Sequence, residues 1–354
     1  MGYQTGNQAM STTESENSGF DFKAHSQVAV SKYQKLKPFY EEFSEIVKNI
    51  LKEALRAEDI KVHSIEARAK SLASFGKKAA FQSDEDPSQP KYTDPSSQIT
   101  DLAGIRIITF FPETLHSVDK AIQSQFDVSE KTDKTDILFK EGKFGYQGIH
   151  YIIRLKANRT TLLEYNRFEN LVAEIQVRTI LQHAWAEIEH DIQYKSVETI
   201  PSLIRRRFMS LAGLLEIADR EFQAIQNEDE QLRQEARISV VEGQLEEVEI
   251  TPDALKAYLD KTLGSDGRMT DWSYQWTARM LRRMGFTNFK QIDECIKGYN
   301  DDHISRLLSG TRQGQLSRFE FLLQVGMGEN YIDRHLWKSH DWFVNSCRNH
   351  LNTL

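Results

Sequence analysis

The clearest hydrophobic pattern of the chain is an alternation of apolar and polar positions in residues 171–179, which is regular from Ala173 to Arg178. Successive side chains of a strand point to opposite faces, so this segment is predicted to be a strand with one apolar and one polar side. The polar side carries a carboxylate, an amide and a guanidinium, from Glu174, Gln176 and Arg178. A solvent-facing edge explains each residue singly, but two strands upstream carry similar polar rows, which indicates the floor of a polar site.

Strand and helix patterns alternate from about residue 60 to residue 195. Short apolar runs predict strands at residues 60–65, 104–111, 149–156 and 171–179. Helical spacing predicts helices at residues 69–80 and 113–124, and another after residue 180 with the apolar stripe Leu181, Trp185, Ile188 and Ile192. The alternation predicts an α/β or α+β fold, in which helices flank a mixed β-sheet.

The segments around this predicted sheet domain differ in composition. Residues 1–24 are rich in polar residues, so we expect a disordered tail. Apolar residues recur at helical spacing in residues 25–57, where Pro38 is expected to separate two helices or to begin the second. The prolines of residues 82–98 predict a loop, and the charged segment 127–143 predicts a mobile loop.

A second, helical domain is predicted to begin at residue 252. Thr251 and Pro252 fit the N-cap and the first position of a helix, and Gly285 fits a helix stop. Four of the five tryptophans lie beyond this point, which indicates a separate core. The expected organisation is a tail (1–24), a sheet domain with N-terminal helices (25–235), a linker or short hairpin (236–251) and an all-α regulatory or interaction domain (252–354).

Composition narrows the class of protein. The chain is 39% hydrophobic and 27% charged, with no apolar run long enough for a membrane span and no signal peptide, so we expect a cytoplasmic protein without a membrane partner. Two cysteines argue against a disulfide scaffold or a cysteine metal site. The formal charge of -7 gives no overall attraction to nucleic acid, so such binding needs local patches such as Arg205–Arg207.

Cationic side chains accompany two carboxylates, Asp101 and Glu174, along the sheet domain. The cations lie near the first strand-to-helix turn, on strands and in the loop before residue 145: Arg68, Lys70, Lys77, Lys78, Arg106, Lys140, Lys143 and Arg154. Triphosphate chemistry needs this combination, because cations neutralise phosphate oxygens and carboxylates hold Mg²⁺. Singly, Asp101 is a typical turn residue and the lysines a typical solvated helix face, but their joint order favours function.

The same residues carry a resemblance to a known family. Segments 101–106, 145–150, 174–179 and 185–190 resemble, in this order, the motifs of the RelA/SpoT alarmone synthetases, over residues 60–196. The resemblance implies a nucleotidyltransferase-like synthetase fold. It also implies transfer of the pyrophosphate of ATP to the 3′-hydroxyl of GDP or GTP, which makes (p)ppGpp. A toxic branch of the family modifies the 3′-CCA end of tRNA instead.

The resemblance implies a role for each matching position. The implied Mg²⁺ ligands are Asp101 and Glu174, with general base as the alternative role of Glu174. The implied ATP site comprises Arg68, Lys70, Ser74, Lys77 and Arg106, and the Arg106 side chain stacks on the adenine. The implied acceptor site comprises Lys143, Tyr146, His150 and Gln176, and the Tyr146 side chain stacks on the acceptor base.

The sequence departs from the family pattern after Tyr146, where Gln147 and Gly148 replace the usual Arg-Ser. This change removes one cation, so the preference between GDP and GTP stays open. Two alternatives to (p)ppGpp synthesis are a toxin that pyrophosphorylates tRNA and a catalytically inactive module on the same fold. The retained pair of carboxylates argues against the inactive module.

Two further features affect the predicted function. His183, Glu187 and His190 share a helix face, but their order is not that of a zinc motif, so a structural or substrate-positioning role is favoured.

Few residues precede the first motif, so we expect a synthetase without the hydrolase domain of longer family members. The expected partners are ATP and a guanosine nucleotide, with tRNA as the alternative acceptor, and a second copy or a regulatory protein docking through residues 252–354.

Overall fold

The computed structural model describes residues 20–133, 148–195, 201–265 and 270–353. The chain divides into two compact units, Met1–Gln223 and Ala224–Leu354. Each unit has its own hydrophobic core. Among the described residues, no helix is both long and apolar enough to cross a membrane.

The first unit is built on a five-stranded mixed sheet. Its strands are β1 (Ser64–Ala69), β2 (Ala103–Thr109), β3 (Phe126–Asp133), β4 (Ile149–Leu155) and β5 (Ala173–Thr179), in the spatial order β1-β2-β5-β4-β3. β2 and β5 are parallel, and the other neighbours are antiparallel. The prediction of a mixed sheet with flanking helices is therefore confirmed.

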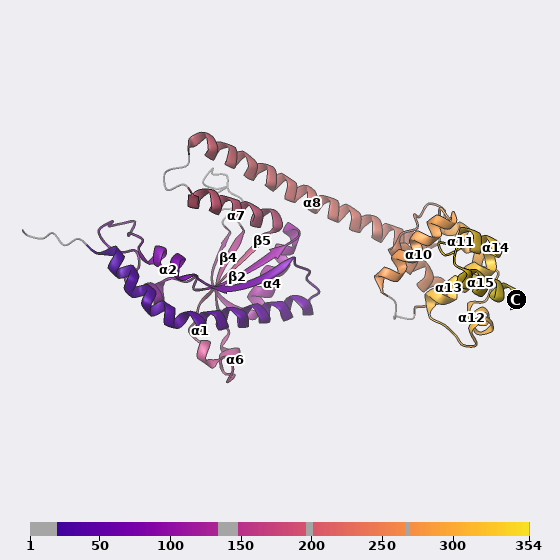
Figure 1. Cartoon of the computed structure of the whole chain (residues 1–354), viewed down its shortest axis with the longest axis horizontal. Helices are drawn as coiled ribbons and strands as arrows, with labels where there is room; N and C mark the ends of the chain where they lie inside the picture. Colours follow the sequence, from indigo (N-terminus) through magenta and orange to yellow (C-terminus); the bar gives the residue numbers. More distant parts are fainter. Residues whose placement is uncertain (1–19, 134–147, 196–200, 266–269, 354) are drawn as a thin grey trace, which may run out of the picture. The chain divides into compact units, whose positions relative to one another are not determined.

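Helices cover both faces of this sheet. The helices of the first unit are α1 (Phe22–Ala57), α2 (Leu72–Ala79), α3 (Pro95–Gln98), α4 (Pro112–Gln125), α6 (Ala157–Thr160), the 3₁₀ helix η1 (Asn166–Phe168), α7 (Ile180–Lys195) and the first part of α8 (Ser202–Glu242). Figure 1 shows α1 along one face and α7 on the other. The apolar face buries Ile105, Ile175 and Tyr151 against Val47 and Val118 of α1 and α4. The opposite, polar face is thereby left for a site.

Three local predictions were wrong. Pro38 lies inside α1, which continues without interruption because its buried side chains, including Phe43 and Val47, pack on the sheet. The charged segment expected to be a loop from residue 127 begins with β3, which pairs antiparallel with β4 along its length. The first strand lies at Ser64–Ala69 rather than at 60–65, since pairing with β2 sets its ends.

All of the regular secondary structure described in the second unit is helical, as predicted. Its helices are α9 (Pro252–Leu263), α10 (Asp271–Met284), α11 (Phe289–Ile296), α12 (Asp301–Ser309), α13 (Gln315–Met327), α14 (Glu329–Arg334) and α15 (Asp341–Thr353), with the end of α8. Thr251 caps α9 by accepting a hydrogen bond from the Ala254 N–H at 3.2 Å. Gly285 ends α10 in the left-handed conformation, with φ of 99°.

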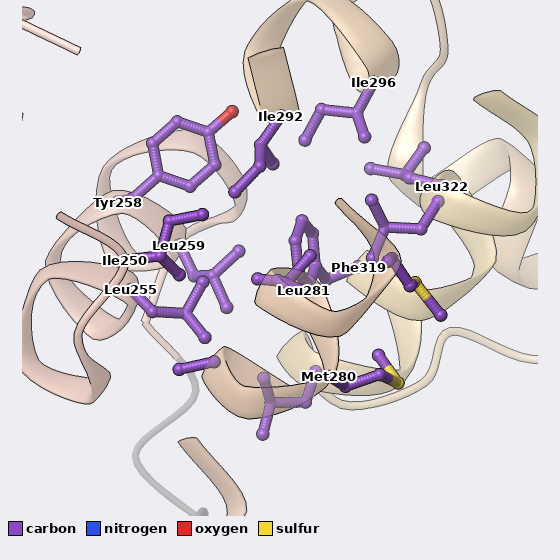
Figure 2. Close-up of a cluster of buried hydrophobic side chains, with 14 of the residues drawn as sticks. Ile250, Leu255, Tyr258, Leu259, Met280, Leu281, Ile292, Ile296, Phe319 and Leu322 are labelled. Atoms are coloured by element: carbon purple, nitrogen blue, oxygen red, sulfur yellow. The ribbon is translucent and has the colours of Figure 1, made fainter. Parts of the chain in front are cut away.

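Aliphatic and aromatic side chains fill the core of this second unit. Figure 2 shows Ile250, Leu281 and Phe319 meeting in its centre, where each is fully buried. The tryptophans contribute less than expected: Trp272 is 70% exposed and Trp342 is 61% exposed. The core therefore depends on Leu, Ile, Phe and Tyr, and the indole rings of Trp272 and Trp342 stay at its edge.

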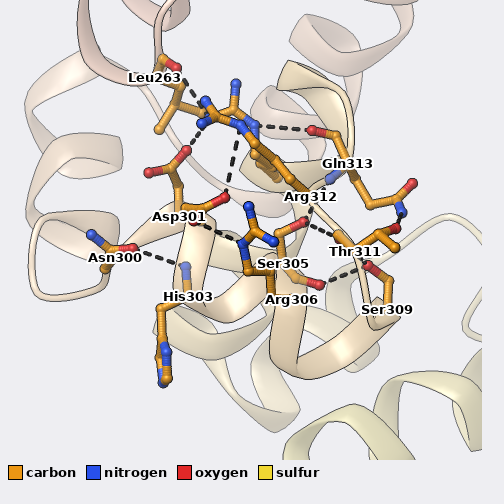
Figure 3. A network of polar contacts seen from close by, with 12 residues as sticks. Leu263, Asn300, Asp301, His303, Ser305, Arg306, Ser309, Thr311, Arg312 and Gln313 are labelled. Atoms are coloured by element: carbon orange, nitrogen blue, oxygen red, sulfur yellow. Dashed lines mark hydrogen bonds and ion pairs between the residues drawn. The ribbon is translucent and has the colours of Figure 1, made fainter.

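The second unit contains a buried arginine, Arg318, that is paired on several sides. The Arg318 guanidinium donates hydrogen bonds to the carbonyl oxygens of Leu263 and Gln313, both at 3.1 Å, and pairs with the Asp301 carboxylate. Figure 3 shows Leu263, Asp301 and Gln313 converging in this network. The network connects the end of α9, the start of α12 and the segment before α13, so its role is structural.

Candidate nucleotide-binding site

A row of polar side chains crosses the polar face of the sheet at one level. The strand register places Glu66 opposite Arg106, Arg106 opposite Gln176, and Gln176 opposite His150. Two residues before Gln176 on the same strand, and therefore on the same face, Glu174 lies opposite Gly104. The alternation seen in the sequence thus becomes a continuous polar surface across four strands.

A cavity of about 230 Å³ opens on this polar surface. Seven residues predicted for the site line it together: Arg68, Lys70, Ser74, Asp101, Arg106, Glu174 and Gln176. Gly104 also lines it, and the absence of a side chain at that position leaves the centre of the sheet open. Residues from three strands, the start of α2 and the loop before β2 therefore share one enclosed space.

Asp101 is held at the cavity by two lysines. Its carboxylate oxygens lie 2.6 Å from Lys70 Nζ and 3.2 Å from Lys78 Nζ. The backbone of Lys70 is fixed in turn, because its carbonyl accepts a hydrogen bond from the buried Tyr33 hydroxyl at 2.9 Å. The sequence placed Lys78 in the cation cluster but not in the site. Its spacing of seven residues from Ser71 puts both on one face of α2, which is the signal that could have singled it out.

Glu174 makes a short contact with a histidine on the polar face. Its Oε1 lies 2.6 Å from Nδ1 of His150 on the neighbouring strand. The His150 side chain is buried, and its Nε2 has no hydrogen-bond partner within the described part of the chain. The imidazole therefore fixes the position of the carboxylate at the cavity wall.

Arg106 connects the cavity to α7. Its Nη1 lies 3.0 Å from Oε1 of Glu187, whose side chain is largely exposed. Burial, and then the nearby charge of Arg106, lower the pKa of both Arg178 and His183 from their ordinary values. His183 is therefore more readily neutral, while the arginines keep this face cationic. Such a face suits a polyanionic ligand such as a phosphate chain.

The remaining predicted residues have different positions. Lys77 is exposed and does not line the cavity, and Ser74 accepts a hydrogen bond from the Ser71 hydroxyl at 2.8 Å at the start of α2. Lys143 and Tyr146 lie outside the described residues. A side chain at Gly148 has no room, because a Cβ there lies 2.0 Å from the Val177 carbonyl oxygen. This close approach explains why glycine replaces the usual serine.

The donor set of the cavity fits a magnesium ion bound together with a substrate. Asp101 and Glu174 line the same space, and Mg²⁺ prefers one or two carboxylates with phosphate oxygens as further ligands. Among the described residues, no group of three or more His, Cys, Asp or Glu side chains forms an all-protein metal site. A magnesium ion held here would therefore need phosphate oxygens of a substrate as further ligands.

Comparisons with known proteins find relatives of the first unit. Residues 67–199 match the family model described as a region found in RelA / SpoT proteins. This chain is 32% identical over 130 residues to the GTP pyrophosphokinase YwaC of Bacillus subtilis, covering 37% of this chain and 59% of that protein. It is 27% identical over 128 residues to the GTP pyrophosphokinase YjbM of the same organism, covering 36% and 58%. The matches thus span about three fifths of these relatives.

Solved structures of synthetases are also similar. Small alarmone synthetase 1 from Bacillus subtilis, bound to its product pppGpp, has a TM-score of 0.46 and 24% identity, covering 56% of this chain and 98% of that one. A GTP pyrophosphokinase family protein from Streptococcus pneumoniae has a TM-score of 0.45 and 19% identity, covering 56% and 95%.

The fold and the cavity define the first unit as a mixed-sheet domain with a cationic site that contains two carboxylates. Residues 67–199 of this domain match the model of the RelA/SpoT family, which is the family that their motifs resemble.

Proposed function

We propose that the first unit is an ATP-dependent pyrophosphokinase that transfers pyrophosphate to the 3′-hydroxyl of GDP or GTP. The observation that carries this proposal is that Asp101, Glu174 and the cations Arg68, Lys70 and Arg106 line one cavity in the region that matches the RelA/SpoT family model. Phosphoryl-type transfer depends mainly on positioning and on neutralising phosphate charge, so this set of side chains is suited to it.

The transfer requires one bond to form and one to break. The acceptor 3′-oxygen bonds to the β-phosphorus of ATP, the bond from that phosphorus to the oxygen bridging to the α-phosphorus breaks, and AMP leaves. Glu174, held by His150, is placed to accept the proton of the acceptor hydroxyl or to hold metal. Arg68, Lys70 and Lys78 neutralise phosphate oxygens, and Arg106 holds the adenine.

Magnesium belongs to this proposal as a cofactor that arrives with ATP. Asp101 and Glu174 are the residues that would hold it. When bound, it neutralises charge on the transferred phosphates. Arg106 is available for nucleotide because its present partners, Glu187 and Glu66, are exposed side chains on two other elements.

The test is to incubate the pure protein with ATP labelled in its β-phosphate and with GDP, GTP or deacylated tRNA in separate reactions. We expect label in a guanosine nucleotide. Label in tRNA alone would make the toxin the correct function, and no transfer from a folded protein to any acceptor would favour the inactive module. A parallel measurement of ATP binding separates failed binding from failed chemistry.

We also propose that the second unit regulates this reaction and does not contribute chemistry. Its core is complete in itself, and the cavity is lined only by residues of the first unit. A chain ending at Gln223 retains the Asp219 carboxylate that accepts a hydrogen bond from Thr179 of β5 at 2.5 Å. We expect this shortened chain to keep transfer activity. A folded but inactive product would instead assign a substrate-binding role to the second unit.

A further inference from the structure

One carboxylate of α7 lies between an arginine of the cavity and a histidine outside it. Oε1 of Glu187 is 3.0 Å from Nη1 of Arg106 and 3.7 Å from Nδ1 of His183, which lies one turn earlier on the same helix. Arg106 lines the cavity of the polar face, whereas Glu187 and His183 do not. Glu187 therefore connects a residue of the proposed ATP site with a histidine outside that site.

The ring nitrogen of His183 nearest to this carboxylate lacks a hydrogen bond. Nδ1 is buried and has no hydrogen-bond partner within the described part of the chain. A distance of 3.7 Å to Glu187 is too long for such a bond. Buried polar atoms are normally paired, so this one needs an explanation. Here the neighbouring carboxylate is bound to Arg106 instead.

The charges around His183 come from the sheet and from α7 itself. The charged groups that act on it, on β2, α7, β5 and β1 in turn, are Arg106, Glu187, Arg178 and Glu66. On α8, the buried Asp219 accepts a hydrogen bond from Thr179. Burial lowers the pKa of His183 most, and the charge of Arg106 lowers it next. The imidazole is therefore neutral near pH 7 while Arg106 stays beside it.

We propose that Glu187 and His183 are positioning residues of the ATP site, an inference that rests on the proposed function. Before nucleotide binds, Glu187 holds Arg106 at the cavity. When Arg106 turns onto the adenine, the Glu187 carboxylate passes to His183, and the imidazole takes up a proton from the solvent. Binding of one ATP thus exchanges the ion pair of Glu187 with Arg106 for an ion pair of Glu187 with His183.

The exchange gives both Glu187 and the buried nitrogen of His183 a partner in the complex. A shift of about 1 Å brings Nδ1 within hydrogen-bond distance of the carboxylate. Loss of a neighbouring cation and contact with a carboxylate both favour the charged imidazole. Because binding takes up a proton, the affinity for ATP should decrease as the pH rises. This dependence extends from the pKa of His183 in the free protein, below 6.5, to its higher pKa in the complex.

The test is isothermal titration calorimetry of the full-length protein with an ATP analogue that has a methylene group between the α- and β-phosphorus, which prevents transfer. Titrations at pH 7 in Pipes and in Tris, whose ionisation enthalpies differ, give the number of protons taken up per nucleotide. We expect the natural protein to take up about half a proton or more in excess of His183→Asn, which cannot titrate. His116→Asn, the same change at an exposed histidine of α4 on the other side of the sheet, should match the natural protein.

Glu187→Gln separates the exchange of ion pairs from the charge of the nucleotide itself. A polyphosphate also favours a protonated imidazole nearby, and that effect persists without the Glu187 carboxylate, whereas the exchange does not. We therefore expect the excess proton to be lost in Glu187→Gln as well, with unchanged helix content by circular dichroism. Proton uptake equal to the natural value in either variant would overturn the inference and leave the proposed function intact. A folded natural protein that does not bind the analogue would overturn the proposed function, and the inference with it.

Discussion

The two units treat their buried polar groups differently. Among the described residues, six buried side-chain polar atoms have no hydrogen-bond partner, and five of them belong to the first unit: Ser96 Oγ, His150 Nε2, Arg178 Nε, His183 Nδ1 and Trp185 Nε1. Four of these lie on β4, β5 or α7, around the polar face of the sheet. Since buried polar groups are normally paired, such a concentration indicates a surface prepared for a ligand.

The second unit contains two buried polar side chains that show the opposite behaviour. Its Arg318 is as deeply buried as a core leucine, yet it is paired with one carboxylate and two carbonyl oxygens. Gln315 is also fully buried and accepts a hydrogen bond from the Tyr274 hydroxyl at 2.8 Å. Paired polar groups hold helices in place, whereas unpaired ones await a partner. Buried charge alone therefore does not identify a catalytic site.

The largest effect is expected from Glu174→Gln in the first unit. The amide cannot accept a proton or hold metal as the carboxylate does, so transfer should fall by about 10²- to 10⁴-fold. Thermal unfolding should be nearly unchanged, because the amide still reaches His150. Glu164→Gln, an exposed position away from the cavity, is the control. Turnover near the natural rate would contradict the role of Glu174.

Arg318→Ala should have the next largest effect, and on stability rather than chemistry. Its removal leaves Asp301 and two carbonyl oxygens without their partner, which costs about 3–5 kcal/mol of unfolding free energy. Denaturant unfolding of the second unit measures this loss. Arg306→Ala, which removes an exposed pair with Asp302, should cost at most about 1 kcal/mol. Equal losses in both variants would show that the buried network adds nothing.

The sequence predicted those features of the two units that depend on a local pattern of residues. Alternation in residues 171–179 placed Glu174 and Gln176 on the polar side of β5, and the cap residues Thr251 and Pro252 placed the start of α9. The motif order then selected seven residues that the fold brings to one cavity. Each strand side, helix start and motif is recognised within one short segment of the chain.

Features that depend on distant partners could not be predicted in this way. β3 is a strand because β4 pairs with it, although its own residues are mostly charged. The contact of His150 with Glu174 depends on the register between β4 and β5, which no local pattern reveals. Pro38 is tolerated because the packing of α1 on the sheet offsets its local cost.

Tyr146→Ala is expected to affect the acceptor more than ATP. Loss of an aromatic ring stacked on a base costs about 1–3 kcal/mol, so the KM for the acceptor should rise by about 5- to 150-fold. Arg106→Ala, at the opposite end of the proposed reaction, should raise the KM for ATP more strongly. Steady-state kinetics with each substrate varied in turn separates the two. An unchanged acceptor KM would leave Tyr146 with a packing role.

The last expected effect concerns Glu320, a largely buried carboxylate that has no ion pair among the described residues. Burial raises the pKa of Glu320 on α13 to about 7. Tyr331 and Cys347 lie close enough that the charge of Glu320 adds to burial in raising their pKa values. A raised pKa in the folded state means that the stability contribution is complete below the ordinary value of 4.5 and is lost as the pH rises through 7.

The free energy of unfolding that Glu320→Gln adds to the second unit should therefore be larger at pH 8 than at pH 5, by up to about 3 kcal/mol. His335 acts in the opposite direction, because burial lowers its pKa to about 4, so its contribution is lost as the pH falls from its ordinary value of 6.5. In the natural chain, the effects of Glu320 and His335 on the pH dependence of the unfolding free energy offset each other between about pH 4.5 and pH 6.5. In the variant only the effect of His335 remains, so its stability should increase as the pH rises through this range. Denaturant unfolding at both pH values, with the exposed Glu329→Gln as control, measures the difference. The same stability gain at pH 5 and pH 8 would mean that Glu320 does not titrate in this range, and the unpaired carboxylate would then carry no pH dependence.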